Sequence, residues 1–164
     1  MKGISLIGFM GSGKTSVGEE LANALQLAFL DTDHQIEIQC GKSIPELFSS
    51  KGEKIFRDYE TMVLKQMPTF DVVVSTGGGI VERRENRKWL KEHYQVIFLN
   101  TDLEVIRKRL ADDRSRPLWQ KGKDEVEQLF QRRFQLYRTT AHRVIDTNNR
   151  DVRMVVEEIL SGIN

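Results

Sequence analysis

The sequence has little of several features that mark specialised classes of protein. Of its 164 residues, one is cysteine, three are proline and three are histidine. The lone Cys40 cannot form a disulfide within the chain, so folding needs no oxidising compartment. No run of about 18 apolar residues occurs, which excludes a membrane-spanning helix. His34, His93 and His142 lie far apart and lack the spacing of zinc ligands or of a catalytic triad.

An excess of charge of one sign is missing as well. The chain has 25 Lys and Arg against 24 Asp and Glu, a net charge of +1. Binding to nucleic acid or to a membrane surface through overall charge therefore has no support. No targeting segment is visible either, because the apolar stretch 4–10 contains Ser5 and Gly8 and has no cleavage site. We expect a cytoplasmic protein without a nucleic-acid or membrane partner. With no apolar stretch left over for a large interface, we expect a monomer.

Short apolar runs of strand length are present, and stretches with helical spacing separate them. The runs are 4–7, 27–30, 72–74, 96–99 and 144–145. This alternation predicts an α/β fold, in which a five-stranded parallel sheet carries helices on both faces. The length is typical of one domain, which we place at 1–164.

Local signals mark where two helices begin. Ser43 with Glu46 and Thr101 with Glu104 both fit the capping box, in which a hydroxyl and a carboxylate bind the first free backbone N–H groups. Segment 114–123 has no periodicity and contains a proline and a glycine, so it is predicted to be a loop.

The segment Gly8–Thr15 matches the phosphate-loop pattern G-x-x-x-x-G-K-[ST]. Its glycines let the backbone curl so that N–H groups face phosphate oxygens, and the helix that follows adds its N-terminal dipole. Lys14 can reach the β- and γ-phosphates, and the Thr15 hydroxyl can bind Mg²⁺. The residues expected to contact ATP are Gly11, Ser12, Gly13, Lys14, Thr15 and Ser16.

The rest of the chain narrows the class of nucleotide-binding protein. No Asn-Lys-x-Asp segment is present to read guanine, which argues against a GTPase. Neither run 72–74 nor run 96–99 ends in an aspartate that could help to hold the metal. Asp31, at the end of the second predicted strand, is the candidate, because strand carboxyl ends surround the site in such sheets. We expect Thr15 and Asp31 to hold Mg²⁺.

Five further motifs follow the phosphate loop in order. They are Asp31-Thr32-Asp33, Gly52-Glu53 with Phe56-Arg57, Gly77-Gly78-Gly79, Arg116-Pro117-Leu118 and Leu136-Tyr137-Arg138. Together they resemble the shikimate kinase family over nearly the whole chain. The resemblance implies a P-loop, nucleoside-monophosphate-kinase-like fold with a substrate-binding segment at about 33–60 and a mobile lid at about 112–124. It also implies transfer of the ATP γ-phosphate to the 3-hydroxyl of shikimate, in the chorismate pathway to aromatic amino acids.

The resemblance assigns the acceptor site to residues of suitable chemistry. Arg57 and Arg138 would grip the shikimate carboxylate, because a guanidinium forms two parallel hydrogen bonds with it. Asp33 would accept hydrogen bonds from the ring hydroxyls, either as a base or only by positioning them; an alternative role is a helix N-cap. Gly78 and Gly79 would place backbone N–H groups against the substrate.

Three more arginines are assigned to the nucleotide. Arg116, in the lid, would join Lys14 in neutralising the transferring phosphoryl group. Arg109 would stack on the adenine. Arg150, in the loop after the last strand, would contact the nucleotide too, although a surface arginine is the plain alternative.

Two other functions stay open on the sequence alone. A different small-molecule P-loop kinase, such as a gluconate kinase, would share the phosphate loop but lack the later motifs. A nucleotide-binding regulatory module would have no acceptor at all. Release of ADP from ATP and Mg²⁺ on addition of shikimate would separate these functions.

Overall fold

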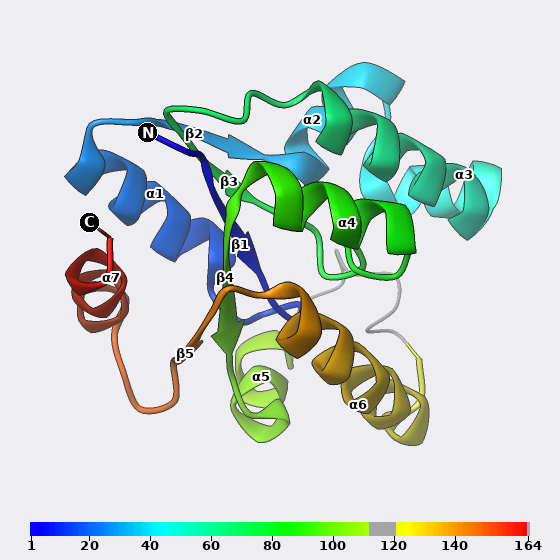
Figure 1. Ribbon diagram of the computed structural model, residues 1–164. Coiled ribbons are helices and arrows are strands. Elements are labelled where there is room, and N and C mark those ends of the chain that lie inside the picture. Colours follow the sequence, from blue (N-terminus) through cyan, green and yellow to red (C-terminus); the bar gives the residue numbers. More distant parts are fainter. Residues whose placement is uncertain (112–120, 164) are drawn as a thin grey trace.

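A computed structural model describes residues 1–111 and 121–163, and in it one or two helices follow each strand (Figure 1). The strands are β1 (Ile4–Ile7), β2 (Ala28–Asp31), β3 (Val72–Ser75), β4 (Gln95–Asn100) and β5 (Arg143–Asp146). The helices are α1 (Lys14–Leu25), α2 (Thr32–Cys40), α3 (Ile44–Gln66), α4 (Arg84–His93), α5 (Leu103–Leu110), α6 (Lys123–Thr140) and α7 (Val152–Ser161).

The five strands form one parallel sheet in the order β2-β3-β1-β4-β5. The central strand β1 pairs with β3 on one side and with β4 on the other, and Ile4 lies opposite both Val73 and Gln95. The strands β2 and β3 therefore lie on one side of β1, and β4 and β5 lie on the other. In open α/β sheets a ligand binds outside the strand carboxyl ends at such a switch point, which is where the phosphate loop follows β1.

Alternating side chains divide the core into two layers, one on each face of the sheet. Leu6 and Val73 pack with α1 and α7, whereas Ile7 and Val74 face the layer formed by α3, α4 and α6. Figure 1 shows the same division, with α1 and α7 on one side and α3, α4 and α6 on the other. The central strands β1, β3 and β4 are thus buried on both faces, as their largely apolar sequences predict, whereas the edge strands β2 and β5 are partly exposed.

The α/β fold and the five-stranded parallel sheet are confirmed, and each predicted strand lies within about two residues of the observed one. The capping box at Ser43 and Glu46 is present. The one predicted at Thr101 is wrong, because α5 is capped at Asp102 and the Thr101 hydroxyl instead binds that of Thr147 at 2.5 Å. Among the described residues, no helix is both long and apolar enough to cross a membrane.

Gly52 divides α3 into two helical segments. Its φ of 83° lies in the left-handed region, which glycine adopts without the cost that a side chain would impose. The kink separates the segment that carries Leu47 from the one that carries Arg57. The second segment is the one that brings charged residues to the cleft.

Candidate active site

A cleft of about 970 Å³ opens at the carboxyl ends of β1, β2 and β3. The phosphate loop forms one end of it, and α2, α3, the glycine loop 77–79 and α6 contribute the other. The loop after β5 and the start of α7 complete the end formed by the phosphate loop. The volume is in the range of small-molecule sites and is large enough for two ligands to meet.

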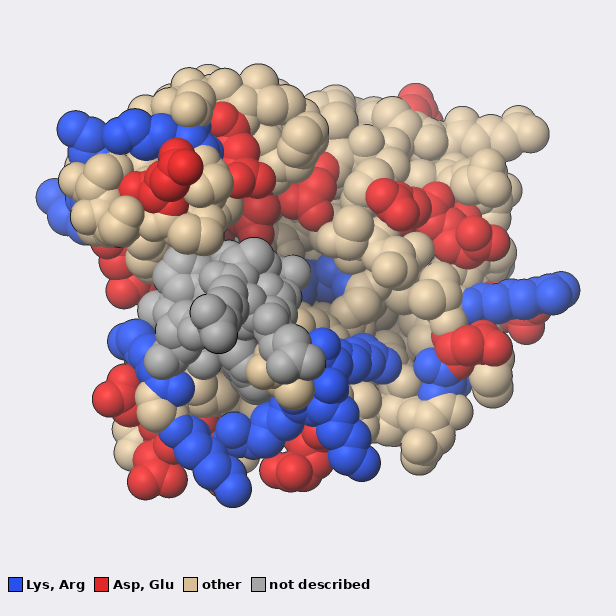
Figure 2. Space-filling model, turned by 180° about the vertical axis from the view of Figure 1, so that it is seen from behind, with Lys and Arg blue, Asp and Glu red and all other residues tan. Residues whose placement is uncertain are grey.

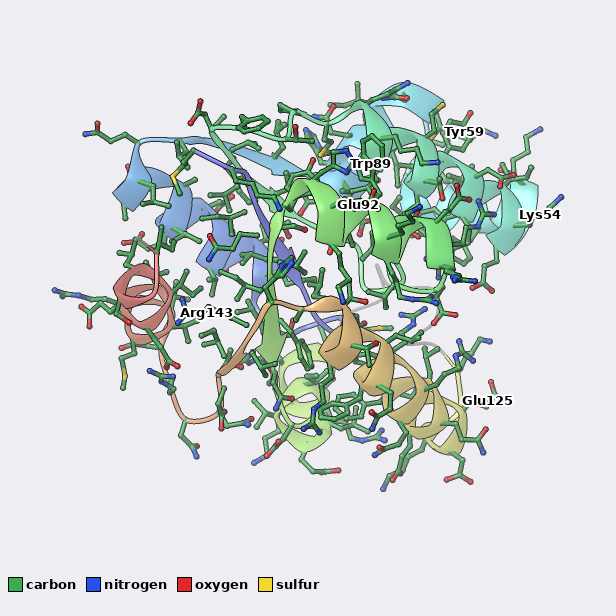
Figure 3. All side chains as sticks on the ribbon, in the orientation of Figure 1. Lys54, Tyr59, Trp89, Glu92, Glu125 and Arg143 are labelled. Carbon is green, nitrogen blue, oxygen red and sulfur yellow. The ribbon has the colours of Figure 1, made fainter. Side chains whose placement is uncertain are left out.

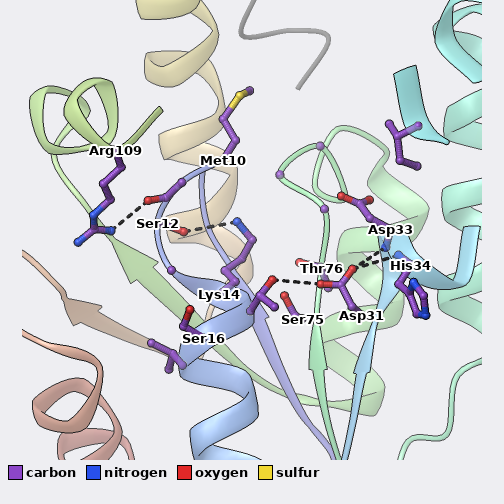
Figure 4. Close-up of a pocket in the computed structure, with 18 of the residues that line it drawn as sticks. Met10, Ser12, Lys14, Ser16, Asp31, Asp33, His34, Ser75, Thr76 and Arg109 are labelled. Carbon is purple, nitrogen blue, oxygen red and sulfur yellow. Dashed lines mark hydrogen bonds between the residues drawn. The ribbon is translucent and has the colours of Figure 1, made fainter. Parts of the chain in front are cut away.

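The phosphate loop curls at two glycines in the left-handed region, Gly11 with φ 78° and Gly13 with φ 93°. Lys14 follows at the start of α1 and is 8% exposed. Its ammonium donates to the carbonyls of Gly8 at 2.7 Å and Phe9 at 2.9 Å. It also approaches Ser12 Oγ at 3.4 Å (Figure 4). The cation is thereby held inside the loop at the helix N-terminus, where anions are favoured.

Thr15 and Asp31 meet at the entrance to the loop. Thr15 Oγ1 donates to Asp31 Oδ2 at 3.2 Å, and Asp31 Oδ1 accepts from the backbone N–H groups of Asp33 and His34 at 2.9 and 3.2 Å (Figure 4). Hydroxyl and carboxylate oxygens suit Mg²⁺, which keeps several waters and needs few protein ligands. This donor set therefore fits the ion, and among the described residues no cluster of three or more His, Cys, Asp or Glu competes for it.

The two aspartates lie in different elements. Asp31 ends β2 and is the N-cap of α2, whereas Asp33 lies in the first helical turn. The alternative of Asp33 as an N-cap is therefore wrong, because Asp31 has that role. Both side chains still line the cleft, since the turn from strand to helix carries them to the same edge.

Arg57 is buried on α3 among acidic side chains and glycine. Its Nη1 donates to Glu60 Oε1 at 2.9 Å, and its Nη2 donates to Glu53 Oε1 at 3.3 Å. A Cβ atom at Gly79 would lie 2.0 Å from Arg57 Nη1. Burial acts to lower the pKa of Arg57, but Glu60 and Glu53 outweigh it and raise the pKa, so the guanidinium stays charged.

Glu60 is a cleft residue that the sequence reasoning missed. It is 1% exposed, and burial raises its pKa to about 7, with Arg57 opposing and Asp33 adding to the shift. A Cβ atom at Gly77 would lie 2.6 Å from Asp33 Oδ1 and 3.0 Å from Glu60 Oε2, so the glycine leaves room for both carboxylates. The spacing of Arg57 and Glu60, three residues apart on a helix, is the signal that could have found it.

The structure does not bring Arg138 to the cleft; it brings Arg133. Arg138 is exposed on α6 and is not among the lining residues, whereas Arg133 is 1% exposed and lines the cleft. The reason is helical phase. Arg133 and Tyr137 are four residues apart and share one face, and the Tyr137 hydroxyl donates to the Gly78 carbonyl at 2.5 Å. Arg138 is turned about 100° away from that face.

The remaining predicted residues divide into two groups. The residues of the phosphate loop and the glycine loop that were predicted to bind ligands do line the cleft: Gly11, Ser12, Gly13, Ser16, Gly78 and Gly79. Arg109 and Arg150 line it too; Arg109 Nη1 donates to the Gly11 carbonyl at 3.0 Å, and Arg150 forms an ion pair with Glu158. Arg116 and most of the predicted lid, residues 112–120, lie outside the described residues.

Comparisons with known proteins identify one family. The family model of shikimate kinase matches residues 10–164. Shikimate kinases of Bacillus cereus and Chromohalobacter salexigens are 43% and 45% identical; the matches cover 100% and 96% of this chain, and 99% and 89% of those relatives.

Solved structures agree. The shikimate kinase of Acinetobacter baumannii in complex with shikimate has a TM-score of 0.94 at 39% identity, over 98% of this chain and 92% of that one. A gluconokinase from Sinorhizobium meliloti reaches a TM-score of 0.60 at 19% identity, over 98% and 90%, which is a likeness of fold alone.

Proposed function

This chain belongs to the shikimate kinase family of ATP-dependent kinases, and we propose that it transfers the γ-phosphate of ATP to the 3-hydroxyl of shikimate in the cleft at the sheet edge. The phosphate loop would hold the nucleotide, and the end of the cleft lined by α3 and α6 would hold the acceptor. The product would enter the chorismate pathway to aromatic amino acids. We extend the proposal to a monomer in the cytoplasm, a compartment where the free Cys40 stays reduced.

One observation carries the choice of acceptor: two buried arginines from different helices flank the glycine loop. Arg57 lies against Gly79, and Arg133 Nη1 would lie 3.4 Å from a Cβ atom at Gly78. Paired guanidiniums are suited to a carboxylate, because each can form two parallel hydrogen bonds in a partly dry site. The absence of side chains at the two glycines lets both guanidiniums lie close to the loop backbone. The pair supports an acceptor that carries a carboxylate.

The phosphoryl end is assigned to the loop and the two aspartates. Lys14 would bind the β- and γ-phosphates, and Thr15 would bind Mg²⁺ directly with Asp31 acting through water. The ion, when bound, supplies charge neutralisation at the phosphates. Asp33 bonds to Asp31 through its backbone N–H and shares the space beside Gly77 with Glu60, so it would accept a hydrogen bond from the attacking hydroxyl and orient it. A base role for Asp33 is part of the same proposal, because proton removal needs an acceptor at that position.

Arg109 and Arg150 are proposed to flank the adenine, since both lie at the nucleotide end. Arg133 takes the role that the sequence gave to Arg138. The assignment of Arg116 to the transferring phosphoryl group stays a prediction from the sequence.

The test is a comparison of acceptors. ADP release from ATP and Mg²⁺ is measured with shikimate, with D-gluconate and with no acceptor. We expect shikimate to raise the rate of ADP release by at least about a hundredfold over the other two. A bound and oriented hydroxyl accepts the phosphoryl group far faster than water does. Turnover with gluconate at the shikimate rate would assign the chain to a sugar-acid kinase. Tight ATP binding without turnover on either acid would favour a regulatory module.

A further inference from the structure

The Arg133 guanidinium is held at Nε, while one of its two Nη groups lacks an acceptor among the described residues. Its Nε donates to Glu82 Oε1 at 2.9 Å, and its side chain is 2% exposed. Within residues 1–111 and 121–163, Nη2 is buried and has no hydrogen-bond partner. A buried cationic N–H group without an acceptor is unfavourable, so this arrangement suits an anion that arrives from the cleft.

Glu82 follows the glycine loop by three residues and contacts Arg133 on α6. Its backbone N–H donates to the Gly79 carbonyl at 3.0 Å, and Arg87 Nη1 donates to the carbonyls of Val81 at 2.7 Å and Glu82 at 3.2 Å. The backbone of Glu82 is therefore fixed on both sides. The side chain bridges from this fixed loop to α6, 51 residues further along the chain.

The two carboxylate oxygens of Glu82 have different partners. Oε1 accepts from buried Arg133, whereas Oε2 accepts from Arg132 Nη2 at 2.8 Å, on a side chain that is 60% exposed. Burial acts to raise the pKa of Glu82, but the two arginines outweigh it and lower the pKa, so the group is a carboxylate at neutral pH. A charged acceptor on Nε fixes the plane of the guanidinium as well as its position.

We propose that Glu82 is a positioning residue for the acceptor site: by holding Arg133 Nε it turns the Nη edge of the guanidinium towards the shikimate carboxylate. The inference rests on the proposed function. Glu82 does not touch the acceptor in this account and acts only through Arg133. Without it, the guanidinium must be ordered at the moment of binding, which weakens the affinity for the acceptor and leaves the nucleotide site unaffected.

The test measures KM for shikimate and for ATP separately. For Glu82→Ala we expect KM for shikimate to rise about tenfold, the loss of one charge-assisted hydrogen bond, with KM for ATP unchanged. Glu82→Gln keeps an oxygen that can accept from Nε, so it should recover part of the loss. The Arg133→Lys variant lacks the Nε group. In that variant, the further change Glu82→Ala should raise KM for shikimate by less than about twofold.

Arg132→Ala is the matched control, because it removes the other ion pair of Glu82 on the exposed side. It should change KM for shikimate by less than about twofold, since exposed pairs contribute little. An effect as large as that of Glu82→Ala would overturn the role of Arg133 Nε. So would an equal rise in both KM values, or a full effect of Glu82→Ala in the Arg133→Lys background.

Circular dichroism and the activity of the wild-type protein separate the possible outcomes. Circular dichroism of each variant establishes that it is folded, and if Glu82→Ala does not fold, Glu82→Gln with a rise in KM for shikimate of about threefold carries the test. A wild-type protein that fails to phosphorylate shikimate would refute the proposed function. An active wild-type protein with unchanged Glu82 variants would refute only the role of Glu82.

Discussion

At Gly79 the protein has no room for a side chain, because the Arg57 guanidinium fills that space. A Cβ atom there would lie 2.0 Å from Nη1 and 2.4 Å from Cζ of Arg57. Gly79→Ala should therefore push Arg57 from its place between Glu53 and Glu60. We expect KM for shikimate to rise by about tenfold or more, the loss of a charge-assisted contact, while KM for ATP stays within about twofold. Steady-state kinetics with each substrate varied in turn checks this, and an equal rise in both KM values would place Arg57 outside the acceptor site.

Glu60 makes the stability of the folded protein depend on pH, and a single substitution can isolate this contribution. Burial raises its pKa from an ordinary 4.5 to about 7, with Arg57 opposing and Asp33 adding to the shift. The folded state therefore binds the proton more tightly than the unfolded state does. The stability contributed by this proton is fully present below pH 4.5 and is lost as the pH rises through about 7.

Glu60→Gln removes that titration. We expect the free energy of unfolding of the wild type, relative to that of Glu60→Gln, to fall as the pH rises from about 5 to about 8. Urea unfolding of both proteins across this range is the measurement. A difference that stays constant, or that grows with pH, would show that Glu60 is charged in the folded protein throughout.

At the scale of the elements, α6 decides which arginine serves the cleft. The face that carries Arg133 and Tyr137 is packed towards the glycine loop, and Arg138 is exposed. Arg133→Ala should raise KM for shikimate by about tenfold or more, because it removes a buried partner for the carboxylate. Arg138→Ala, five residues away, is the matched control and should change it by less than about twofold. The reverse order of effects would restore the assignment to Arg138.

The element scale also explains what the sequence could predict. The central strands were located closely because every residue of β1 and β3 is buried, so these strands are largely apolar runs. The whole phosphate loop could be predicted because phosphate binding requires particular residue types at a fixed spacing. The phase of α6 could not be predicted in the same way, since arginines at 132, 133 and 138 differ only in which face the tertiary packing covers.

Contacts between segments far apart in the sequence were the other feature that could not be predicted. The ion pair of Glu82 and Arg133 joins residues 51 apart, and no local pattern announces it. The same holds at the far side of the sheet, where Arg143 extends from β5 to α7 (Figure 3) and donates to the carbonyls of Ile159 and Glu158 at 3.0 and 3.2 Å. Thr101 was misread for this reason, because its hydroxyl is committed to Thr147 on a neighbouring segment.

At the scale of the whole molecule, charges of both signs lie on the surface, and a few buried charged side chains line the cleft. Basic and acidic side chains both occur on the face seen in Figure 2, in keeping with a net charge of +1. The two arginines that we propose bind the acceptor are buried instead, and each is paired with an acidic side chain: Glu60 for Arg57 and Glu82 for Arg133. Recognition of the acceptor is therefore expected to depend on a few fixed, desolvated pairs and only weakly on the overall field.

The central claim is that this cleft phosphorylates shikimate because paired buried arginines bind its carboxylate. The most direct measurement is kcat/KM for shikimate and for its methyl ester, which has the same ring and hydroxyls but no negative charge, at constant ATP and Mg²⁺. We predict that the ester is poorer by at least about a hundredfold, since it loses charge-assisted contacts with both Arg57 and Arg133. An ester phosphorylated as efficiently as shikimate would contradict the account.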